Sequence, residues 1–372
     1  MSNSGIKKIF EQFSAEGTLL DGSPTGSGHI HTTWLIRTAE EDRPDYIVQK
    51  INHIVFPPVA EMMGNIQKVT GHISAKNKTS TNGKVLEIIK TRAGTSYYTD
   101  PEGNHWRMYR KISPGISYDV VPNNKVAFEA GRAFGKFIGD LRDLPANEIY
   151  PVIPGFNSME MRFEQLKKAV KTDPLKRVSE VKKEIGYAFD RIDDMLVISS
   201  LEKEGKLPQR ITHNDTKLNN VLFDNDDKAV CVIDLDTVMP GLSLYDFGDT
   251  IRTAANTAEE DEPDTRKINF SLPVFKAYSE GFLKETISFL NTYETDHLAL
   301  SAQYMTFIMG IRFLADYILG DVYYTTRYSN HNLDRCRAQF RLMQLMNEKY
   351  TDTRNIIKQT LEKYRTGNTG KP

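Results

Sequence analysis

Cysteine is scarce in this sequence, and its scarcity limits the kinds of protein the chain can be. Only two cysteines, Cys231 and Cys336, occur among 372 residues. Two are too few for a disulfide framework, and they do not form a zinc-binding pattern. We predict that both are small apolar side chains in a reducing compartment, and therefore that the protein is cytoplasmic.

An excess of charge of either sign is also absent. The 48 Lys and Arg residues nearly balance the 49 Asp and Glu residues, which leaves a formal net charge of −1. Proteins that bind nucleic acids or anionic membranes through charge carry a basic excess. We therefore expect no nucleic-acid partner and no membrane partner.

Long apolar runs are missing as well. No stretch reaches the ~18 consecutive apolar residues that cross a bilayer, and residues 1–8 contain no apolar signal core. We expect a protein that is neither exported nor membrane-spanning. The composition, 39% hydrophobic and 26% charged, is typical of a globular protein, and 372 residues suffice for two lobes with separate cores.

What the sequence does contain is an ordered set of polar residues between positions 211 and 236. His213 and Asp215 are followed by Asn220, and Asp234 comes after a short apolar run. Apolar residues 221–223 and 230–233 flank a polar segment, 224–227, which predicts a β-hairpin with a tight turn. The polar side chains are then expected at strand ends, beside a cleft.

This order of residues suits phosphoryl transfer. That reaction requires a carboxylate facing the acceptor hydroxyl and hard oxygen ligands for Mg²⁺ on a nucleoside triphosphate. We assign the first task to Asp215 and the second to Asn220 and Asp234, with ATP and Mg²⁺ as cofactors. Any one of these residues could instead be a turn former, but the ordered set favours a phosphotransferase. Asp246 is predicted to accept hydrogen bonds from loop amides.

The first part of the chain predicts a small β-rich lobe. Residues 6–13 have helical spacing, and β-type runs flank Gly26 and Gly28, whose lack of side chains would allow backbone amides to approach phosphates. In the strand predicted at 45–52, the position where kinase-like folds carry a phosphate-binding lysine is occupied by Gln49. Either the register shifts and Lys50 binds the phosphates, or Gln49 replaces the charge.

A helix is predicted over 59–73, with Glu61 in solvent, and strands over 85–89 and 106–112. The connector 111–115 is predicted to be a hinge, with Lys111 and Ser113 meeting the adenine. We therefore divide the chain into a nucleotide-binding lobe, residues 1–112, and a catalytic and substrate lobe, residues 113–372.

The second lobe is predicted to be mainly helical, which makes the whole an α+β, bilobal, protein-kinase-like fold. Helices are expected over 127–144, 158–172, 178–204, 272–290, 297–319 and, as one or two helices, 332–365. The acidic stretch 259–262 reads as a solvated loop. On a helix, Arg312 and Asp316 could form a surface ion pair.

The stretch from His213 to Asp249 resembles the signature of the phosphotransferase family that contains aminoglycoside phosphotransferases and choline kinases. The segments "THNDTKLNNVLF", "VIDLDTVMPG" and "YDFGD" are more similar still to the N-acetylhexosamine 1-kinases within it, as are "GSGHI", "HWRMYRKI" and "RFLADYILGDVYY". The resemblance implies that N-acetylglucosamine or N-acetylgalactosamine is phosphorylated at C1. It also implies that His29, Arg312 and Tyr323 contact the sugar, beside Asp215.

Two alternatives remain open at this level. A sibling kinase could act on choline, homoserine, another amino alcohol or an aminoglycoside, although a cationic acceptor would call for an aromatic cage or an acidic site. The glutamine at position 49 also allows a nucleotide-binding scaffold without catalysis.

Overall fold

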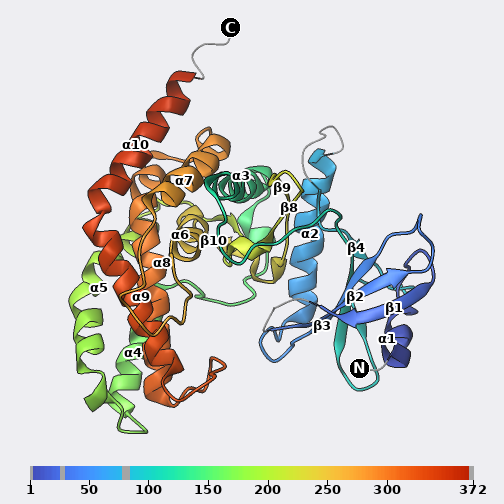
Figure 1. Ribbon diagram of the computed structural model, residues 1–372, viewed down its shortest axis with the longest axis horizontal. Helices are drawn as coiled ribbons and strands as arrows, with labels where there is room; N and C mark the ends of the chain where they lie inside the picture. Colours follow the sequence, from blue (N-terminus) through green and yellow to red (C-terminus); the bar gives the residue numbers. More distant parts are fainter. Residues whose placement is uncertain (1–2, 26–29, 78–83, 368–372) are drawn as a thin grey trace.

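The computed structural model describes residues 3–25, 30–77 and 84–367. Figure 1 shows a sheet with two helices at one end of the molecule and a group of packed helices at the other. Gly26 and Gly28, predicted to approach phosphates, and His29, predicted to contact the sugar, lie outside the described residues.

The sheet is antiparallel throughout and has six strands, in the order β1-β2-β3-β6-β4, with β5 also paired to β6. Its strands are β1 (Leu19–Pro24), β2 (Thr32–Thr38), β3 (Tyr46–Ile51), β4 (Ile88–Ile89), β5 (Tyr98–Thr99) and β6 (His105–Arg110). The strand expected at 85–89 is therefore shorter than predicted.

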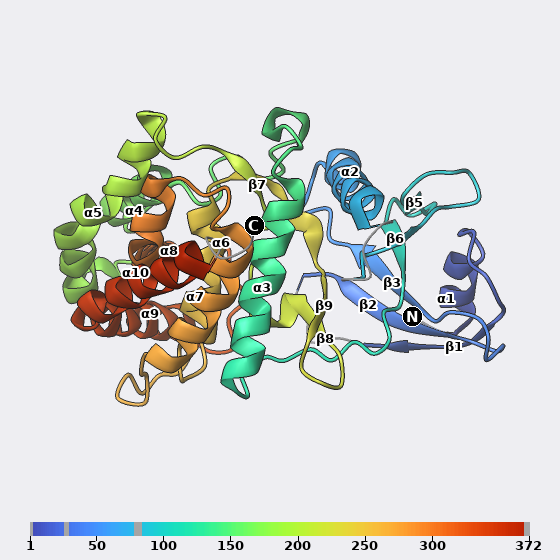
Figure 2. The same ribbon diagram turned by 90° about the horizontal axis from the view of Figure 1, so that it is seen from above.

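A helix covers each face of this sheet (Figures 1 and 2). Helix α1 (Asn3–Phe10) packs with Val48 and Trp106, whereas α2 (Val59–Asn77) packs with Ile51 and Tyr109. Because side chains alternate along a strand, Gln49 lies on the α2 face and Lys50 on the α1 face. Glu61 of α2 is exposed, as predicted, and has no ion-pair partner among the described residues.

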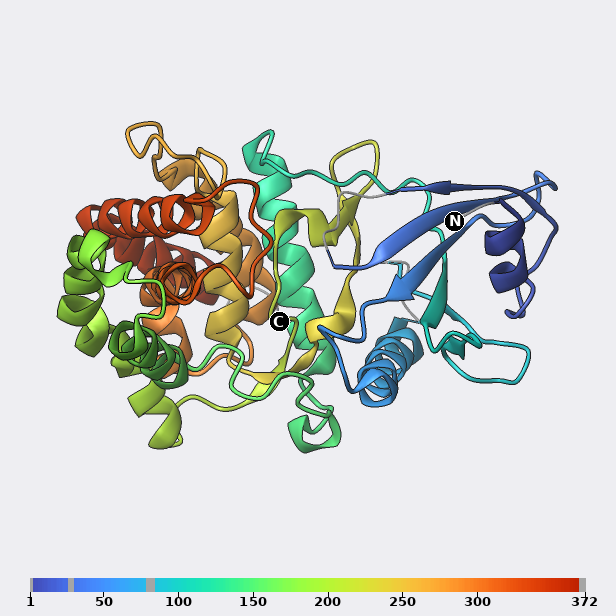
Figure 3. The same cartoon turned by 90° about the horizontal axis from the view of Figure 1, so that it is seen from below.

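The second region is mainly helical and lies at the opposite end of the molecule from the sheet (Figure 3). Its helices are α3 (Asn124–Leu141), α4 (Met159–Thr172), α5 (Lys182–Lys203), α6 (Ser243–Ala254), α7 (Leu272–Thr286), α8 (Thr292–Leu319), α9 (His331–Glu348) and α10 (Tyr350–Gly367). Residues 332–365 thus form two helices. Helix α8 begins five residues before the predicted start because Asn291 and Glu294 form a capping box.

Helix α8 is the core helix of this region. By length and composition it is the one described helix that could cross a membrane, yet 83% of its most apolar window is buried inside the protein. Tyr304, Phe307 and Ile311 are among its fully buried side chains. Its apolar character is explained by packing against α6 and α9.

The acidic stretch 259–262 is not the freely solvated loop that was predicted. The Glu260 carboxylate pairs with Arg252 of α6 at 2.5 Å, and Asp261 pairs with His331 of α9 at 2.8 Å. Because Arg252 and His331 are buried, these contacts anchor the loop to the helical core.

Glycines allow α3 and α7 to pack with their backbones in contact. A Cβ on Gly281 would overlap the carbonyl oxygen of Phe128, and one on Gly131 would overlap that of Tyr278. Gly186 in α5 is exposed, and a Cβ there would meet nothing within 4 Å.

We predict that Gly281→Ala lowers the free energy of unfolding by about 3 kcal/mol or more, because neither backbone can move away without separating the helices. Gly186→Ala, the same change in an open helical position, should raise it by up to about 1 kcal/mol. Urea unfolding followed by circular dichroism measures both. Equal effects at the two positions would contradict the proposed close contact.

Candidate active site

Two antiparallel pairs of short strands position the polar residues that the sequence singled out. Strand β7 (Arg210–Thr212) pairs with β10 (Met239–Gly241), and β8 (Val221–Phe223) pairs with β9 (Ala229–Val232). The β8–β9 pair is the predicted hairpin, with the polar turn between its strands. A backbone hydrogen bond of 2.9 Å from the Ile233 amide to the Asn220 carbonyl brings the two polar segments side by side.

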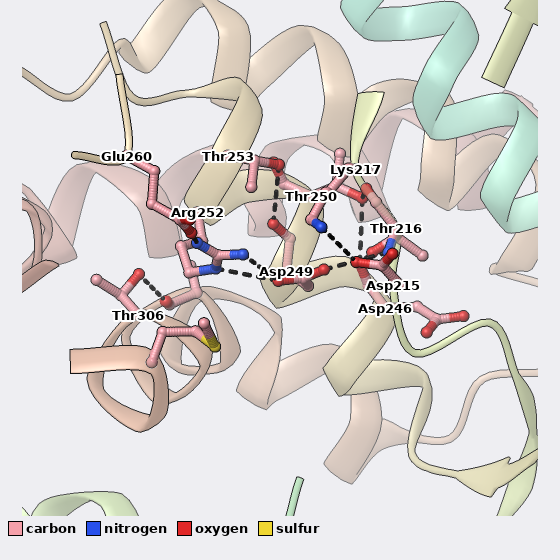
Figure 4. Close-up of polar contacts among 12 residues, drawn as sticks. Asp215, Thr216, Lys217, Asp246, Asp249, Thr250, Arg252, Thr253, Glu260 and Thr306 are labelled. Atoms are coloured by element: carbon pink, nitrogen blue, oxygen red, sulfur yellow. Dashed lines mark hydrogen bonds and ion pairs between the residues drawn. The ribbon is translucent and has the colours of Figure 1, made fainter. Parts of the chain in front are cut away.

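Helix α6 holds the loop that follows β7. The Asp246 carboxylate accepts the amides of His213 and Asn214, both at 2.8 Å, and Asp249 accepts the Thr216 amide at 3.1 Å. This confirms Asp246 as an acceptor of loop amides. Arg252 pairs in turn with Asp249 at 2.9 Å, so the carboxylate that holds the Thr216 amide is itself held by a buried ion pair (Figure 4).

Asp215 lies at the centre of this loop. Its carboxylate pairs with Lys217 at 3.2 Å and accepts a hydrogen bond from the Asn220 amide nitrogen at 3.3 Å. Burial alone would raise the pKa of Asp215, but Lys217 and His213 outweigh it and lower the pKa below its usual value. The carboxylate is therefore ionised at neutral pH and able to accept a hydrogen bond from a hydroxyl.

His213 itself is fully buried and supports the loop. Its Nε2 hydrogen-bonds to the carbonyl of Ile233 at 2.8 Å, and its ring packs against Phe134 and Phe137 of α3. The His213 ring and its Nε2 atom both contact other parts of the protein. His213 therefore connects the loop of Asp215 to Ile233, the residue that precedes Asp234.

Asp234 is the aspartate in this group whose carboxylate has no partner. Asp215, Asp236, Asp246 and Asp249 each accept hydrogen bonds or pair with a cation. The Asp234 side chain is exposed and contacts no donor among the described residues. Although the residue is accessible to solvent, the protein packed around its carboxylate, together with the charges of Asp236 and Asp215, raises the pKa of Asp234 to about 6, so a cation beside it would be strongly favoured.

Asn220 presents an oxygen at the same place. Its amide nitrogen donates to the Asp215 carbonyl at 2.8 Å, which leaves its side-chain oxygen without a partner among the described residues. No group of three or more His, Cys, Asp or Glu side chains that could hold a metal ion occurs among the described residues, so the protein side of a site here consists of these two oxygen-bearing side chains. One carboxylate and one amide oxygen suit Mg²⁺, which commonly takes its other ligands from phosphates and water.

The geometry agrees with comparisons to known proteins. The family described as "Phosphotransferase enzyme family" matches residues 21–280, which is more than half of the chain. The chain belongs to this family.

Solved structures show that this phosphotransferase has the protein-kinase-like fold of aminoglycoside phosphotransferases, so the predicted α+β class is confirmed. An aminoglycoside phosphotransferase from Alicyclobacillus acidocaldarius is 12% identical, with a TM-score of 0.61 over 95% of this chain and 96% of that one. The amicoumacin kinase hAmiN, in complex with AMP-PNP, Ca²⁺ and Ami, is 11% identical, with a TM-score of 0.55 over 95% and 94%. A choline kinase from Cryptosporidium parvum is 12% identical, with a TM-score of 0.52 over 97% of each chain.

A second cluster of the phosphotransferase contains the predicted Arg312 and Tyr323. The Arg312 guanidinium lies 5.4 Å from the ring centre of Phe156, 5.9 Å from that of Tyr323 and 5.5 Å from that of Tyr324. Arg312 does not pair with Asp316, contrary to the surface ion pair considered above. Asp316 instead accepts the amides of Val322, Tyr323 and Tyr324 at 2.8–3.0 Å, which fixes the loop after α8.

Sequence reasoning missed one member of this cluster, Arg162. Arg162 of α4 donates to the Phe156 carbonyl, and burial together with the nearby Arg312 lowers the pKa of Arg162 to about 10. Neither arginine pairs with a carboxylate among the described residues. The Tyr324 hydroxyl is buried and has no hydrogen-bond partner there either. The Glu260 carboxylate is near enough to raise the pKa of both Tyr324 and Lys217, and Lys217 is the ion-pair partner of Asp215.

The predicted nucleotide contacts are spread over the sheet and the connector. Lys111 lies 3.6 Å from Asp45 and 3.3 Å from the Ser113 hydroxyl, and the Ser113 carbonyl accepts a hydrogen bond from Lys84. Their contact with adenine stays a prediction. The Lys50 side chain makes no hydrogen bond with the described residues and lies on the α1 face of the sheet, whereas Gln49 faces α2.

A further group was missed entirely: Arg107, His31 and Asp236 form a buried network with Gln49. Arg107 is 1% exposed and pairs with Asp236 through both terminal nitrogens. One signal could have revealed it. Arg107 stands between Trp106 and Met108 in the strand segment "HWRMYR". An arginine that is buried at such a position requires a carboxylate partner.

We predict that Asp316→Ala releases the loop that carries Tyr323. Loss of three charge-assisted amide hydrogen bonds should cost about 3 kcal/mol of stability and increase hydrogen exchange of amides 322–324 by at least about tenfold. Mass spectrometry of exchanged peptides measures this. Asp296→Ala, at an exposed position of the same helix, is the matched control. Unchanged exchange in the Asp316 variant would refute the assigned role.

Proposed function

We propose that this phosphotransferase uses ATP and Mg²⁺ to phosphorylate the anomeric C1 hydroxyl of an N-acetylhexosamine, N-acetylglucosamine or N-acetylgalactosamine. The observation that carries the proposal is a cluster of two arginines without carboxylate partners, and a tyrosine hydroxyl without any partner, among the described residues. Glu260 is near enough to act electrostatically on both Tyr324 of this cluster and Lys217, the partner of Asp215. Such a cluster favours an uncharged or anionic acceptor rich in oxygen atoms.

Asp215 is the catalytic base in this proposal. The C1 oxygen bonds to the γ-phosphorus while the bond from that phosphorus to the β–γ bridging oxygen breaks, and ADP leaves with the electron pair. Asp215 accepts the hydroxyl proton. Because an anomeric hydroxyl is more acidic than an ordinary alcohol, a carboxylate of low pKa can serve as a late base.

Asn220 and Asp234 are the residues that would hold the metal. When bound, Mg²⁺ neutralises charge on the β- and γ-phosphates. Lys217, paired with Asp215, adds a positive charge at the point where the phosphoryl group must pass. Gly26 and Gly28 at the phosphates, Lys111 and Ser113 at the adenine, and His29 at the sugar complete the site as predicted from sequence. We place the hinge between residues 1–112 and 113–372 at the same connector.

The printed names of structural neighbours suggest other acceptors, such as aminoglycosides and choline. These molecules are cationic, and two unpaired guanidinium groups repel cations. The exposed Tyr323 and half-buried Tyr324 already have Arg312 against their rings, so the aromatic faces are occupied by a cation of the protein. The site therefore supports a sugar more than either of these acceptors.

We predict that N-acetylglucosamine is converted to its 1-phosphate, and that phosphorus NMR of the product will show a phosphate coupled to the anomeric proton. Choline, homoserine and a panel of aminoglycosides should give no phosphorylated product under the same conditions. Phosphate on one of them instead would establish a sibling kinase. Thermal stabilisation by Mg–ATP without any turnover would establish a nucleotide-binding scaffold.

Asp215→Asn should lower kcat by about a thousandfold, because the base is lost, while the dissociation constant for Mg–AMP-PNP changes less than about threefold. Steady-state kinetics and calorimetry measure the two quantities. Asp226→Asn is the matched control, because it makes the same change in the exposed turn of the β8–β9 hairpin. Activity of Asp215→Asn close to that of the wild type would rule out its assignment as the base.

The charge of the acceptor provides a further test. Glucosamine, which carries an ammonium group in place of the acetamide, should have a kcat/KM at least about tenfold below that of N-acetylglucosamine, because of repulsion by Arg162 and Arg312. Arg162→Met should reduce this ratio. A ratio unaffected by Arg162→Met would show that the arginines do not determine acceptor charge.

A further inference from the structure

Three parts of the sheet region meet at one carboxylate of the helical region. Arg107 of β6 pairs with both oxygens of Asp236, its Nη2 lying 2.8 Å from Oδ2. The Nε of Arg107 donates to Gln49 of β3 at 2.9 Å. His31, which directly precedes β2, contacts the same carboxylate through Nε2. Arg107, His31 and Asp236 have side chains that are 1%, 7% and 3% exposed.

The hydrogen on His31 can be assigned from its other contact. Its Nδ1 accepts the Asn52 amide at 3.0 Å, so Nδ1 carries no proton. The proton is therefore on Nε2, which donates to Asp236. The carboxylate thus receives three donors from the sheet region and is fully compensated inside the protein.

On its other side, Asp236 belongs to the short segment that follows the predicted metal ligand. Asp234 has a left-handed backbone conformation, with φ 61° and ψ 59°, and opens the 3-10 turn Leu235–Thr237. The Thr237 hydroxyl donates to the His213 carbonyl at 2.7 Å, and Asn214 donates to the Thr237 carbonyl at 3.1 Å. One turn therefore joins Arg107, Asp234 and the loop of Asp215.

We propose that Arg107 and Asp236 are a positioning pair, which holds the metal-binding carboxylate of Asp234 in its left-handed turn and couples the sheet to the catalytic loop. The proposal rests on the proposed function, because Asp234 is there the magnesium ligand. In kinase-like folds an ion pair between a β3 lysine and a helix glutamate aligns the lobe. Here Gln49 occupies the β3 position, and the cation comes from the paired residue on β6.

The contacts distinguish positioning from direct phosphate binding. All three nitrogens of the Arg107 guanidinium face protein partners, and the group is almost completely enclosed. Glu61 of α2 cannot provide the alternative alignment, because it is exposed and unpaired among the described residues. A buried ion pair adds little stability compared with a neutral pair of similar shape, so stability alone does not account for it.

The test is a double variant, Arg107→Met with Asp236→Asn, which removes both charges and leaves an acceptor for His31. We expect a folded protein whose affinity for Mg²⁺ in the presence of AMP-PNP falls by about 10- to 100-fold, with a similar loss of kcat. The KM for the sugar should change less than about threefold, since the acceptor cluster is untouched. Calorimetry, steady-state kinetics and urea unfolding provide the three measurements.

The matched control is Arg110→Met with Glu87→Gln. Arg110 is on the same strand and pairs with Glu87 at 2.9 Å on the surface, with side chains 39% and 54% exposed. Wild-type Mg²⁺ affinity and kcat in the control, with losses in the Arg107 variant, support the proposal. Wild-type values in a folded Arg107 double variant overturn it.

Arg107→Lys serves if the double variant does not fold. It keeps the charge but loses the two-pronged contact, so an intermediate loss of Mg²⁺ affinity supports positioning, and wild-type affinity overturns it. The proposed function fails separately: a wild-type protein that binds Mg–AMP-PNP but phosphorylates no sugar refutes the acceptor, while the effect of Arg107 on Mg²⁺ affinity is still measured.

Discussion

The active site depends on buried carboxylates that accept backbone amides. Asp246 and Asp249, one turn apart on α6, take the amides of the loop that carries Asp215. Hydrogen bonds to a charged group contribute about 1.5–3 kcal/mol each, enough to hold Asn214 in a left-handed conformation with φ 65°. Because α6 packs on the buried core helix α8, the position of the loop is set by the core of the helical region.

Cations or backbone amides of the protein also compensate most of the carboxylates around the site. Five aspartates, Asp215, Asp234, Asp236, Asp246 and Asp249, are close enough to affect one another, yet four are compensated by cations or amides. Only Asp234 among them lacks a compensating group in the described part of the chain. Because the other four carboxylates are compensated, a cation is favoured most beside the two carboxylate oxygens of Asp234. That distribution, more than any single residue, makes the site suited to a divalent ion.

The acceptor side carries charge of the opposite sign. Arg162 belongs to α4 and Arg312 to α8. Asp316 accepts backbone amides of the loop that carries Tyr323 and does not pair with either arginine. The structural neighbours share the fold at 11–12% identity, and a fold alone does not determine the substrate. In the proposed function, the identity of the acceptor depends on this cluster.

Much of the fold was accessible from the sequence. Helical and alternating periodicities predicted the order of sheet and helices, and the β8–β9 hairpin was found with its turn. Boundaries were less accurate where a cap determined them, as at Asn291 before α8, or where one strand was only two residues long. The acidic stretch 259–262 was misread because its partners, Arg252 and His331, are contributed by distant helices.

By itself, then, the sequence determined the fold class, the phosphotransferase family and the polar triad of Asp215, Asn220 and Asp234, since these are encoded in local spacing. Tertiary structure alone decided which charges are neutralised. It paired Asp236 with Arg107 across 129 residues, left Arg162 and Arg312 without carboxylates, and turned Gln49 rather than Lys50 toward α2. The physical reason is that a side chain's electrostatic role depends on its neighbours in space, and most of these neighbours are remote in the chain.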